Sequence, residues 1–132
     1  MNWKPILLKS FFKMKNEINV WYIVLGATLG IFAQLGAWLQ HNLQFKYPKY
    51  EPTWWGWYVA AIPITWLFLN STKYGVFGFG GSIWANRFLG FSMGIIVYAI
   101  CTNYFFNQPV TPKVFVQILL CVVIMGVQFL WK

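Results

Sequence analysis

Residues 18–39 read INVWYIVLGATLGIFAQLGAWL, a stretch without a single charged side chain. A helix needs about 20 predominantly apolar residues to cross the hydrocarbon core of a bilayer. In lipid the backbone polar groups also have to be satisfied internally, which a helix does within one segment. The stretch therefore predicts a membrane crossing, and the rest of the chain repeats its character.

The same stretch combines small residues with one polar side chain. The small residues recur at close to four-residue spacing: Gly26, Gly30, Ala33 and Gly36. This spacing places them on one face of a helix and lets a second helix approach the backbone, so we expect Gly26, Gly30 and Gly36 to be helix-packing positions. Gln34 is the one clearly polar side chain deep in the stretch, and an amide in lipid normally faces a partner helix or a cavity.

Three further apolar stretches follow, over residues 54–69, 82–106 and 114–131. The composition is 59% hydrophobic, 22% aromatic and 9% charged, and the only two carboxylates, Glu17 and Glu51, lie outside all of the apolar stretches. A soluble domain of 132 residues buries too small a fraction of its surface to hide so much apolar area. We therefore predict an all-α integral membrane protein, with a four-helix transmembrane domain over residues 18–132.

Residues 1–17 form a separate basic segment. Within NWKPILLKSFFKMKN (residues 2–16) the apolar side chains lie broadly on one side at helical spacing, and Lys9 and Lys13 lie on another. This pattern predicts a short amphipathic helix on the membrane surface. The net charge is +8 and the lysines gather at the ends of the apolar stretches. We therefore expect anionic lipid headgroups, and not nucleic acid, as the partner.

The lysines between the apolar stretches also predict an orientation. The larger set is Lys4, Lys9, Lys13, Lys15, Lys73 and Lys132, and the set on the other side is Lys46, Lys49 and Lys113. Cytoplasmic segments carry the excess of basic residues in membrane proteins. We expect a multi-pass protein of the plasma (inner) membrane with both termini in the cytoplasm.

Arg87 lies inside an apolar stretch, near the start of residues 82–106. A charged side chain in such a stretch is costly to place in lipid, and Arg87 is the most costly of the sequence. Its long stem allows it to reach back to the headgroups, or it lines a cavity, where it would hold an anionic group. Trp84 and Asn86 lie beside it in the sequence. Together with Gln34, these residues are the candidate cavity or solute-binding residues.

Other glycines and one proline predict the shape of the helices. Gly90 and Gly94 have the GxxxG spacing of a close helix contact, so we expect both to be helix-packing positions. Pro63 removes one backbone hydrogen bond within the second stretch and predicts a kink. The glycine-rich residues 75–81 predict an irregular or broken helix close to the membrane.

The sequence offers no set of residues for catalysis, metal binding or a cofactor. The one histidine, His41, lies in a polar link without further nitrogen or sulfur donors near it in the sequence. Cys101 and Cys121 lie in apolar stretches and are interpreted as small packing residues. No paired acids and no Ser-His-Asp set can be assembled, so we do not expect an enzyme.

From residue 21 onward the layout resembles the small multidrug resistance transporters of the drug/metabolite transporter superfamily. The likeness rests on YIVLG (22–26), SIWA (82–85), YFFNQP (104–109) and VQILLCVVIMGV (116–127). It implies a four-crossing fold and a tendency to pair with a second copy or a related chain. The family's first helix carries a membrane-embedded Glu, whereas the corresponding residues 29–34 read LGIFAQ. Proton-driven export is therefore not implied.

Two hypotheses for the function remain open. The first is a non-catalytic accessory or scaffold subunit that packs against itself or other membrane proteins through its small-residue faces. The second is a transporter-like protein that moves or holds a neutral, amphipathic or anionic solute without an intramembrane carboxylate. The second hypothesis requires a cavity between the helices.

Overall fold

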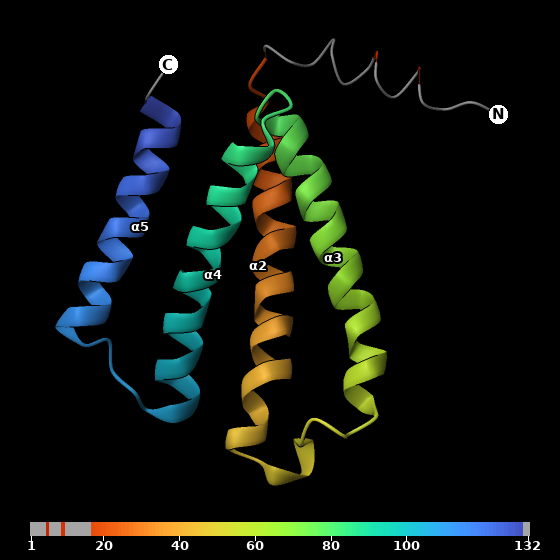
Figure 1. Cartoon of the computed structure of the whole chain (residues 1–132), viewed down its shortest axis with the longest axis vertical. Helices are drawn as coiled ribbons and strands as arrows, with labels where there is room; N and C mark the ends of the chain where they lie inside the picture. The colour runs from red at the N-terminus through yellow and green to blue at the C-terminus, as the bar shows by residue number, and fades with distance from the viewer. Residues whose placement is uncertain (1–4, 6–8, 10–16, 131–132) are drawn as a thin grey trace.

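The computed structural model describes Pro5, Lys9 and residues 17–130, apart from the side chains of Gln128 and Phe129. This part of the chain is all-helical (Figure 1). Its elements are α2 (Val20–Asn42), the short 3-10 turns η1 (Leu43–Phe45) and η2 (Pro48–Tyr50), α3 (Gly56–Gly78), α4 (Ile83–Phe106) and α5 (Pro112–Leu130). The predicted interfacial helix over residues 1–17 lies outside the described residues, except for Pro5, Lys9 and Glu17.

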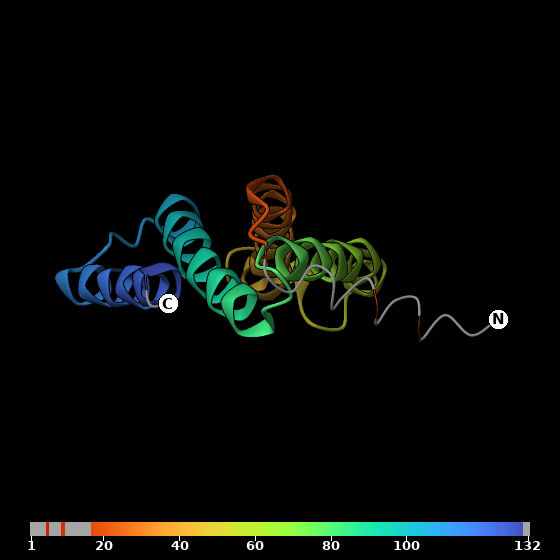
Figure 2. The ribbon, with the colours of Figure 1, turned by 90° about the horizontal axis from the view of Figure 1, so that it is seen from above.

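The four long helices run up and down in turn. In Figures 1 and 2, α2 packs against α3 and α4, whereas α5 lies on the outer side of α4. The first residue of α2 and the last of α5 lie at the same end of the molecule. Because α3 and α4 separate from each other below the turn that joins them, α2 is the element that links the two.

Local sequence signals begin and end these helices. Asn19 caps α2 by accepting a hydrogen bond from the backbone N–H of Tyr22 at 3.2 Å, and Ser82 caps α4 by accepting one from that of Ala85 at 3.2 Å. α4 ends at Asn107, which has a left-handed φ of 51°. Gly80 and Gly81, at φ 61° and 91°, form the turn between α3 and α4.

The second helix differs from the prediction. The second apolar stretch continues past residue 69, because α3 runs without a break from Gly56 through Pro63 to Gly78. Of the glycine-rich residues 75–81, only residues 79–81 form an irregular turn. The polar residues at its centre find partners on helices: Asn70 donates to the Trp66 carbonyl at 2.9 Å, and Ser71 donates to that of Gly26 at 2.7 Å. Because these bonds satisfy the polar side chains of Asn70 and Ser71, both residues can lie within the long helix.

The closest helix contact joins α2 to α3. A Cβ added at Gly26 would lie 2.7 Å from the backbone nitrogen of Gly75 and 3.0 Å from the carbonyl oxygen of Ser71. The start of α2 is tied to the end of α3 as well, because the Asn19 N–H donates to the Gly78 carbonyl at 2.9 Å. The small residues thus allow the two backbones to touch.

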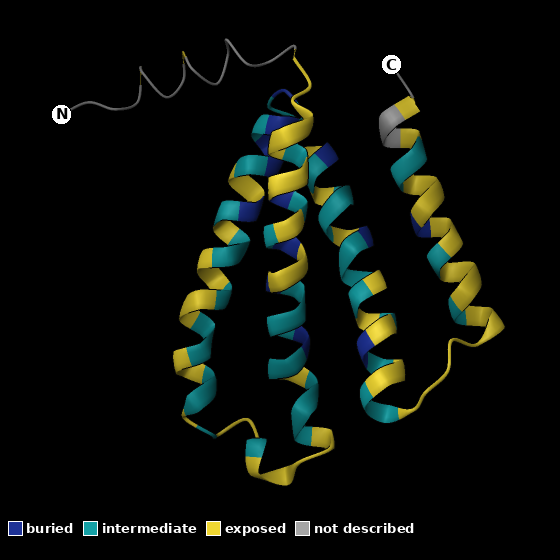
Figure 3. Ribbon diagram, turned by 180° about the vertical axis from the view of Figure 1, so that it is seen from behind, coloured by how far each residue is buried: buried dark blue, intermediate teal, exposed yellow. Residues whose placement is uncertain are grey.

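Two helical segments of the described chain are long and apolar enough to cross a membrane, Val20–Phe45 and Ile83–Phe106, with mean hydropathy of 1.6 and 1.5. Only 17% of the most apolar window in each segment is buried inside the protein. Burial is concentrated where α2, α3 and α4 meet, and most of the surface of α5 is exposed (Figure 3). By length and composition, each of these two helical segments could cross a membrane.

Replacing Gly26 by alanine should destabilise the bundle by about 1–3 kcal/mol, the usual cost of forcing extra volume into a packed contact. The atoms that a new Cβ would meet belong to the backbone of α3, which cannot move aside as a side chain can. Thermal unfolding of the detergent-solubilised protein measures the effect.

Gly126→Ala is the matched control. A Cβ at Gly126 meets no heavy atom within 4 Å, and alanine is favoured over glycine in a helix by about 1 kcal/mol. The control should therefore melt at or above the temperature of the unchanged protein. Equal melting temperatures for the two variants would contradict the contact.

Candidate functional site: a groove between three helices

The structure has a groove of about 610 Å³ between α2, α3 and α4. Its polar lining residues are Gln34 from α2, Ser71 and Thr72 from α3, and Asn86, Arg87 and Tyr98 from α4. Its main apolar lining residues are Phe68, Ile83, Phe91, Met93 and Ile95. A second hollow of about 400 Å³ shares Gln34, Phe68, Gly94 and Tyr98 with it and reaches Trp38, His41 and Asn42. The two hollows follow the α4 side of α2 along much of its length.

Three of the four candidate cavity residues line this groove: Gln34, Asn86 and Arg87. The fourth, Trp84, does not. Its side chain is 72% exposed and stacks on Phe88 with the ring centroids 6.0 Å apart. Trp84 lies in the first turn of α4, and its ring packs on Phe88 of the same helix, whereas Ile83, Asn86 and Arg87 line the groove.

Gln34 bridges α2 and α4. Its Nε2 donates to the carbonyl oxygen of Gly90 at 3.3 Å. A Cβ at Gly94 would lie 3.0 Å from the same Nε2, so the glycine leaves room for the amide. Gln34 therefore links α2 to α4 and forms part of the groove lining.

Asn86 lies against α3. A Cβ at Gly75 would coincide with the space that the Asn86 Oδ1 atom occupies and would lie 2.8 Å from its Cγ. The Asn86 side chain is half-buried and makes no hydrogen bond to any residue in the described ranges. The side chain is thus positioned by packing while its amide keeps its hydrogen-bonding capacity.

Arg87 is exposed at the mouth of the groove, in the second turn of α4. Within the part of the chain that the structure describes, its guanidinium has neither an ion-pair partner nor a hydrogen bond. The lining contains no carboxylate, and the two carboxylates of the sequence, Glu17 and Glu51, lie elsewhere. This end of the groove therefore carries an uncompensated positive charge.

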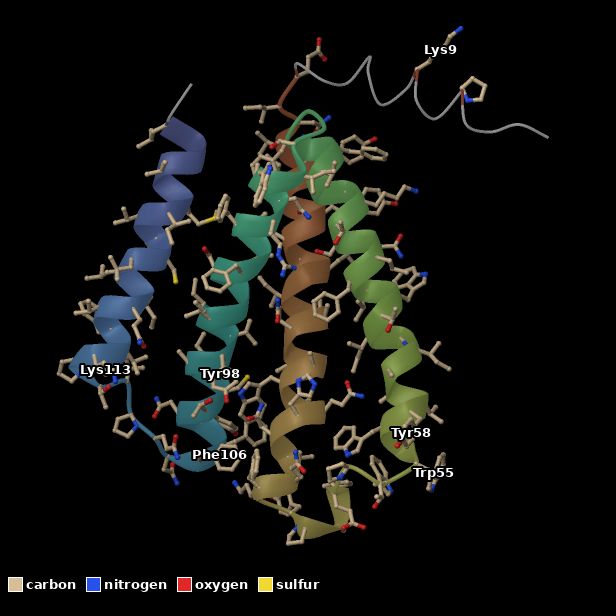
Figure 4. All side chains as sticks on the ribbon, in the orientation of Figure 1. Lys9, Trp55, Tyr58, Tyr98, Phe106 and Lys113 are labelled. Atoms are coloured by element: carbon tan, nitrogen blue, oxygen red, sulfur yellow. The ribbon has the colours of Figure 1, made fainter. Side chains whose placement is uncertain are left out.

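At the opposite end of the groove several polar side chains are hydrogen-bonded to one another. Tyr98 Oη donates to Asn42 Oδ1 at 3.1 Å, and Trp38 Nε1 donates to Thr102 Oγ1 at 3.3 Å. Lys46 Nζ donates to the Phe105 carbonyl at 2.8 Å and so satisfies an acceptor in the last turn of α4. Tyr98 marks this end in Figure 4. The charged side chain among the described lining residues, Arg87, lies at the other end of the groove.

The glycines predicted to pack helices fall into two groups. A Cβ at Gly26, Gly30 or Gly36 would meet α3, at Gly75, Ser71 and Ile64 respectively, and one at Gly94 would meet Gln34. Gly90 differs from the prediction of a close helix contact, because a Cβ there meets no heavy atom within 4 Å and the residue lines the groove. The GxxxG spacing does not show which side of a helix has a partner.

Sequence reasoning missed the residues of α3 that complete the site. Ser71 and Gly75 form the contact surface for α2, and Gly75 also receives Asn86. Their spacing of about one helical turn matches that of the small residues in α2, and this was the available signal. It was overlooked because the neighbouring glycines suggested a broken helix.

The described residues contain no group of three or more His, Cys, Asp or Glu side chains that could hold a metal ion. Comparisons of the chain with protein-family models, with curated proteins and with solved structures give no match.

A double-mutant cycle tests the contact between Gly75 and Asn86. Gly75→Ala places a Cβ in the space of the Asn86 amide and should destabilise the protein, whereas the same change in an Asn86→Ala background should be nearly neutral. Residues in direct contact show coupling energies of about 0.5–3 kcal/mol. Unfolding of the single and double variants in detergent measures the coupling, and strictly additive effects would argue against the contact.

Proposed function

We propose that this chain is a four-crossing membrane protein that holds a solute in the groove between α2, α3 and α4. The crossings would be α2, α3, α4 and α5. The helices α3 and α5 contain 23 and 19 residues, and they measure about 35 and 29 Å at the α-helical rise. Each length suits a hydrocarbon core of about 30 Å.

The distribution of aromatic side chains supports this placement. Tyr50, Trp54 and Trp57 form a cluster between η2 and the start of α3, with centroid separations of 4.9 to 5.8 Å. In Figure 4, Trp55, Tyr58 and Phe106 lie at this same end of the bundle, together with Lys113. Aromatic and basic residues gather in this way at membrane interfaces.

The positive-inside rule orients the protein with both termini in the cytoplasm of a cell with an inner membrane. In a bacterial host, a fluorescent protein fused after residue 132 or inserted in the turn over residues 79–82 should fluoresce. Alkaline phosphatase, which is active only outside the cytoplasm, should be active in the link over residues 107–111. The reverse pattern would contradict the orientation. If reporters at residues 107–111 and at the C-terminus lie on the same side of the membrane, α5 does not cross it.

The observation that carries the binding function is the unpartnered Arg87 at a groove also lined by Gln34 and Asn86. A charged group at the edge of lipid is costly, and such groups usually mark a binding site or pathway. A guanidinium offers a fork of donors that suits carboxylate and phosphate. The groove also offers mainly apolar walls, so an anionic or amphipathic solute fits it better than a cation.

The resemblance to small multidrug resistance transporters agrees with a solute site between helices but not with their use of a membrane-embedded Glu. The groove lining lacks a carboxylate, so we propose solute binding that does not depend on proton exchange by such a group. Whether solute is moved or only held is a separate question that transport measurements decide.

Arg87→Gln should abolish the co-purification of an anionic small molecule with the protein. The chain is extracted in mild detergent, and its bound small molecules are identified by native mass spectrometry. Lys73→Gln is the matched control, because Lys73 is an exposed cation near the same end of the bundle that does not line the groove. Equal loss in both variants, or no bound solute in the unchanged protein, would contradict the proposal.

A second candidate is the accessory or scaffold subunit, and α5 is the observation in its favour. α5 packs on α4 and exposes most of its apolar side chains, whereas Cys121 is buried at 7% exposure. In the same mass measurement a scaffold would travel with a second copy or another membrane protein. A monomer with a bound solute would exclude it.

A further inference from the structure

We propose that the groove holds a single-chain amphiphile, with its oxyanion head at Arg87 and its alkyl chain along the groove toward Tyr98. This inference rests on the proposed binding function and specifies the class of ligand. It follows from the way in which polar and apolar groups are divided along the groove.

The head end is defined by hydrogen-bonding groups that remain free. The side chains of Arg87 and Asn86 have no hydrogen-bond partner among the residues that the structure describes. A phosphate or carboxylate at this point would pair with the guanidinium and accept a bond from the Asn86 amide. Because no carboxylate lines the groove, nothing there would attract a cationic head.

In the middle of the groove no charged side chain of the described residues contributes to the lining, and the Ser71 hydroxyl and the Gln34 amide nitrogen are already engaged in hydrogen bonds. Ser71 already donates to the Gly26 carbonyl at 2.7 Å, and Gln34 Nε2 already donates to the Gly90 carbonyl at 3.3 Å. Between and beyond them, the walls are apolar: Phe68, Phe91, Met93 and Ile95. This surface suits an alkyl chain, because burial of each methylene group is favourable by about 0.8 kcal/mol.

The dimensions agree with one chain from one leaflet. Along α4 the distance from Arg87 to Tyr98 is about 16 Å at the helical rise, and half of a hydrocarbon core is about 15 Å. A ligand with its head at Arg87 would therefore have its polarity aligned with that of the surrounding lipids. The volume of about 610 Å³ is that of a pocket for one drug-sized molecule, which favours one alkyl chain over two.

Gly90 provides an independent test of the path of the chain. It lines the groove, and a Cβ at this position meets no heavy atom within 4 Å. A leucine at residue 90 would therefore fill the groove and leave the contact between α2 and α3 undisturbed. Gly126 has equally free space but lies on α5, away from the groove, so Gly126→Leu is the matched control.

The probes are dodecyl phosphate, dodecyltrimethylammonium and inorganic phosphate. The protein is reconstituted in nanodiscs of phosphatidylcholine, and the bound probe is measured by native mass spectrometry during titration. We expect dodecyl phosphate to bind and the cationic analogue to bind at least tenfold more weakly. We expect inorganic phosphate neither to bind measurably nor to displace the amphiphile.

The variants separate head from chain. Arg87→Gln should weaken the binding of dodecyl phosphate by about 10- to 100-fold, the worth of one charge-assisted hydrogen bond or ion pair out of water. Arg87→Lys should restore part of the affinity. Gly90→Leu should abolish binding without lowering the melting temperature, whereas Lys73→Gln and Gly126→Leu should bind as the unchanged protein does.

Three outcomes would overturn the inference. Equal binding of the cationic analogue would refute the oxyanion head, and displacement by inorganic phosphate would assign the site to a free oxyanion. Unchanged binding of dodecyl phosphate in Gly90→Leu would show that the alkyl chain does not lie in the groove. If Arg87→Gln also leaves the binding unchanged, the probe binds only to the bilayer. Each of these leaves the proposed solute binding intact if an Arg87-dependent small molecule still co-purifies, so the two proposals fail separately.

Discussion

The fold depends on the contact between the backbones of α2 and α3. The proposed membrane placement gives this contact its weight, because helices in lipid associate through close packing and hydrogen bonds more than through the hydrophobic effect. Gly26 brings α2 to within contact of Gly75, and Ser71 uses the approach to donate to the Gly26 carbonyl at 2.7 Å. Larger residues at these positions would separate the helices and break the hydrogen bond as well.

The same contact determines where the groove forms. With α3 held on α2, the short turn through Gly80 and Gly81 sends α4 back beside α2 while α3 and α4 separate from each other (Figure 1). Gln34 then fixes α4 through the Gly90 carbonyl, and Tyr98 fixes it again through Asn42. The groove between α3 and α4 thus has α2 as its floor, and the charged side chain of its described lining, Arg87, lies near the start of α4.

The sequence predicted the positions of three helices well, because long uncharged stretches leave few alternatives in lipid. The observed bounds of α2, α4 and α5 lie within three residues of the predicted stretches. The sequence did not predict where α3 ends, because Asn70, Ser71 and Lys73 are polar and the glycines after them indicate an irregular segment. Ser71 has its partner on another helix, and no local pattern contains that information.

The candidate site was partly predictable for a related reason. Polar side chains at membrane depth are rare and costly, so Gln34, Asn86 and Arg87 could be selected from composition alone. Trp84 could not be separated from them, because one residue in a helix turns the side chain by about 100° and the sequence does not show which direction faces a neighbour. Gly75 could not be selected either, since its role is defined by Asn86 on another helix.

Exposed apolar side chains and exposed polar side chains differ in what they indicate about a binding partner. The side chains of α5 are exposed in the isolated chain, but lipid solvates apolar faces as well as a partner helix would. Their exposure is therefore compatible with a partner and equally with none. The side chains of Arg87 and Asn86 are different: they have no hydrogen-bond partner in the described part of the chain, and an apolar environment cannot satisfy them. Water, a lipid headgroup or a bound ligand would have to supply their hydrogen bonds. Because the groove beside them has mainly apolar walls, a molecule with one charged end and one apolar end fits it best.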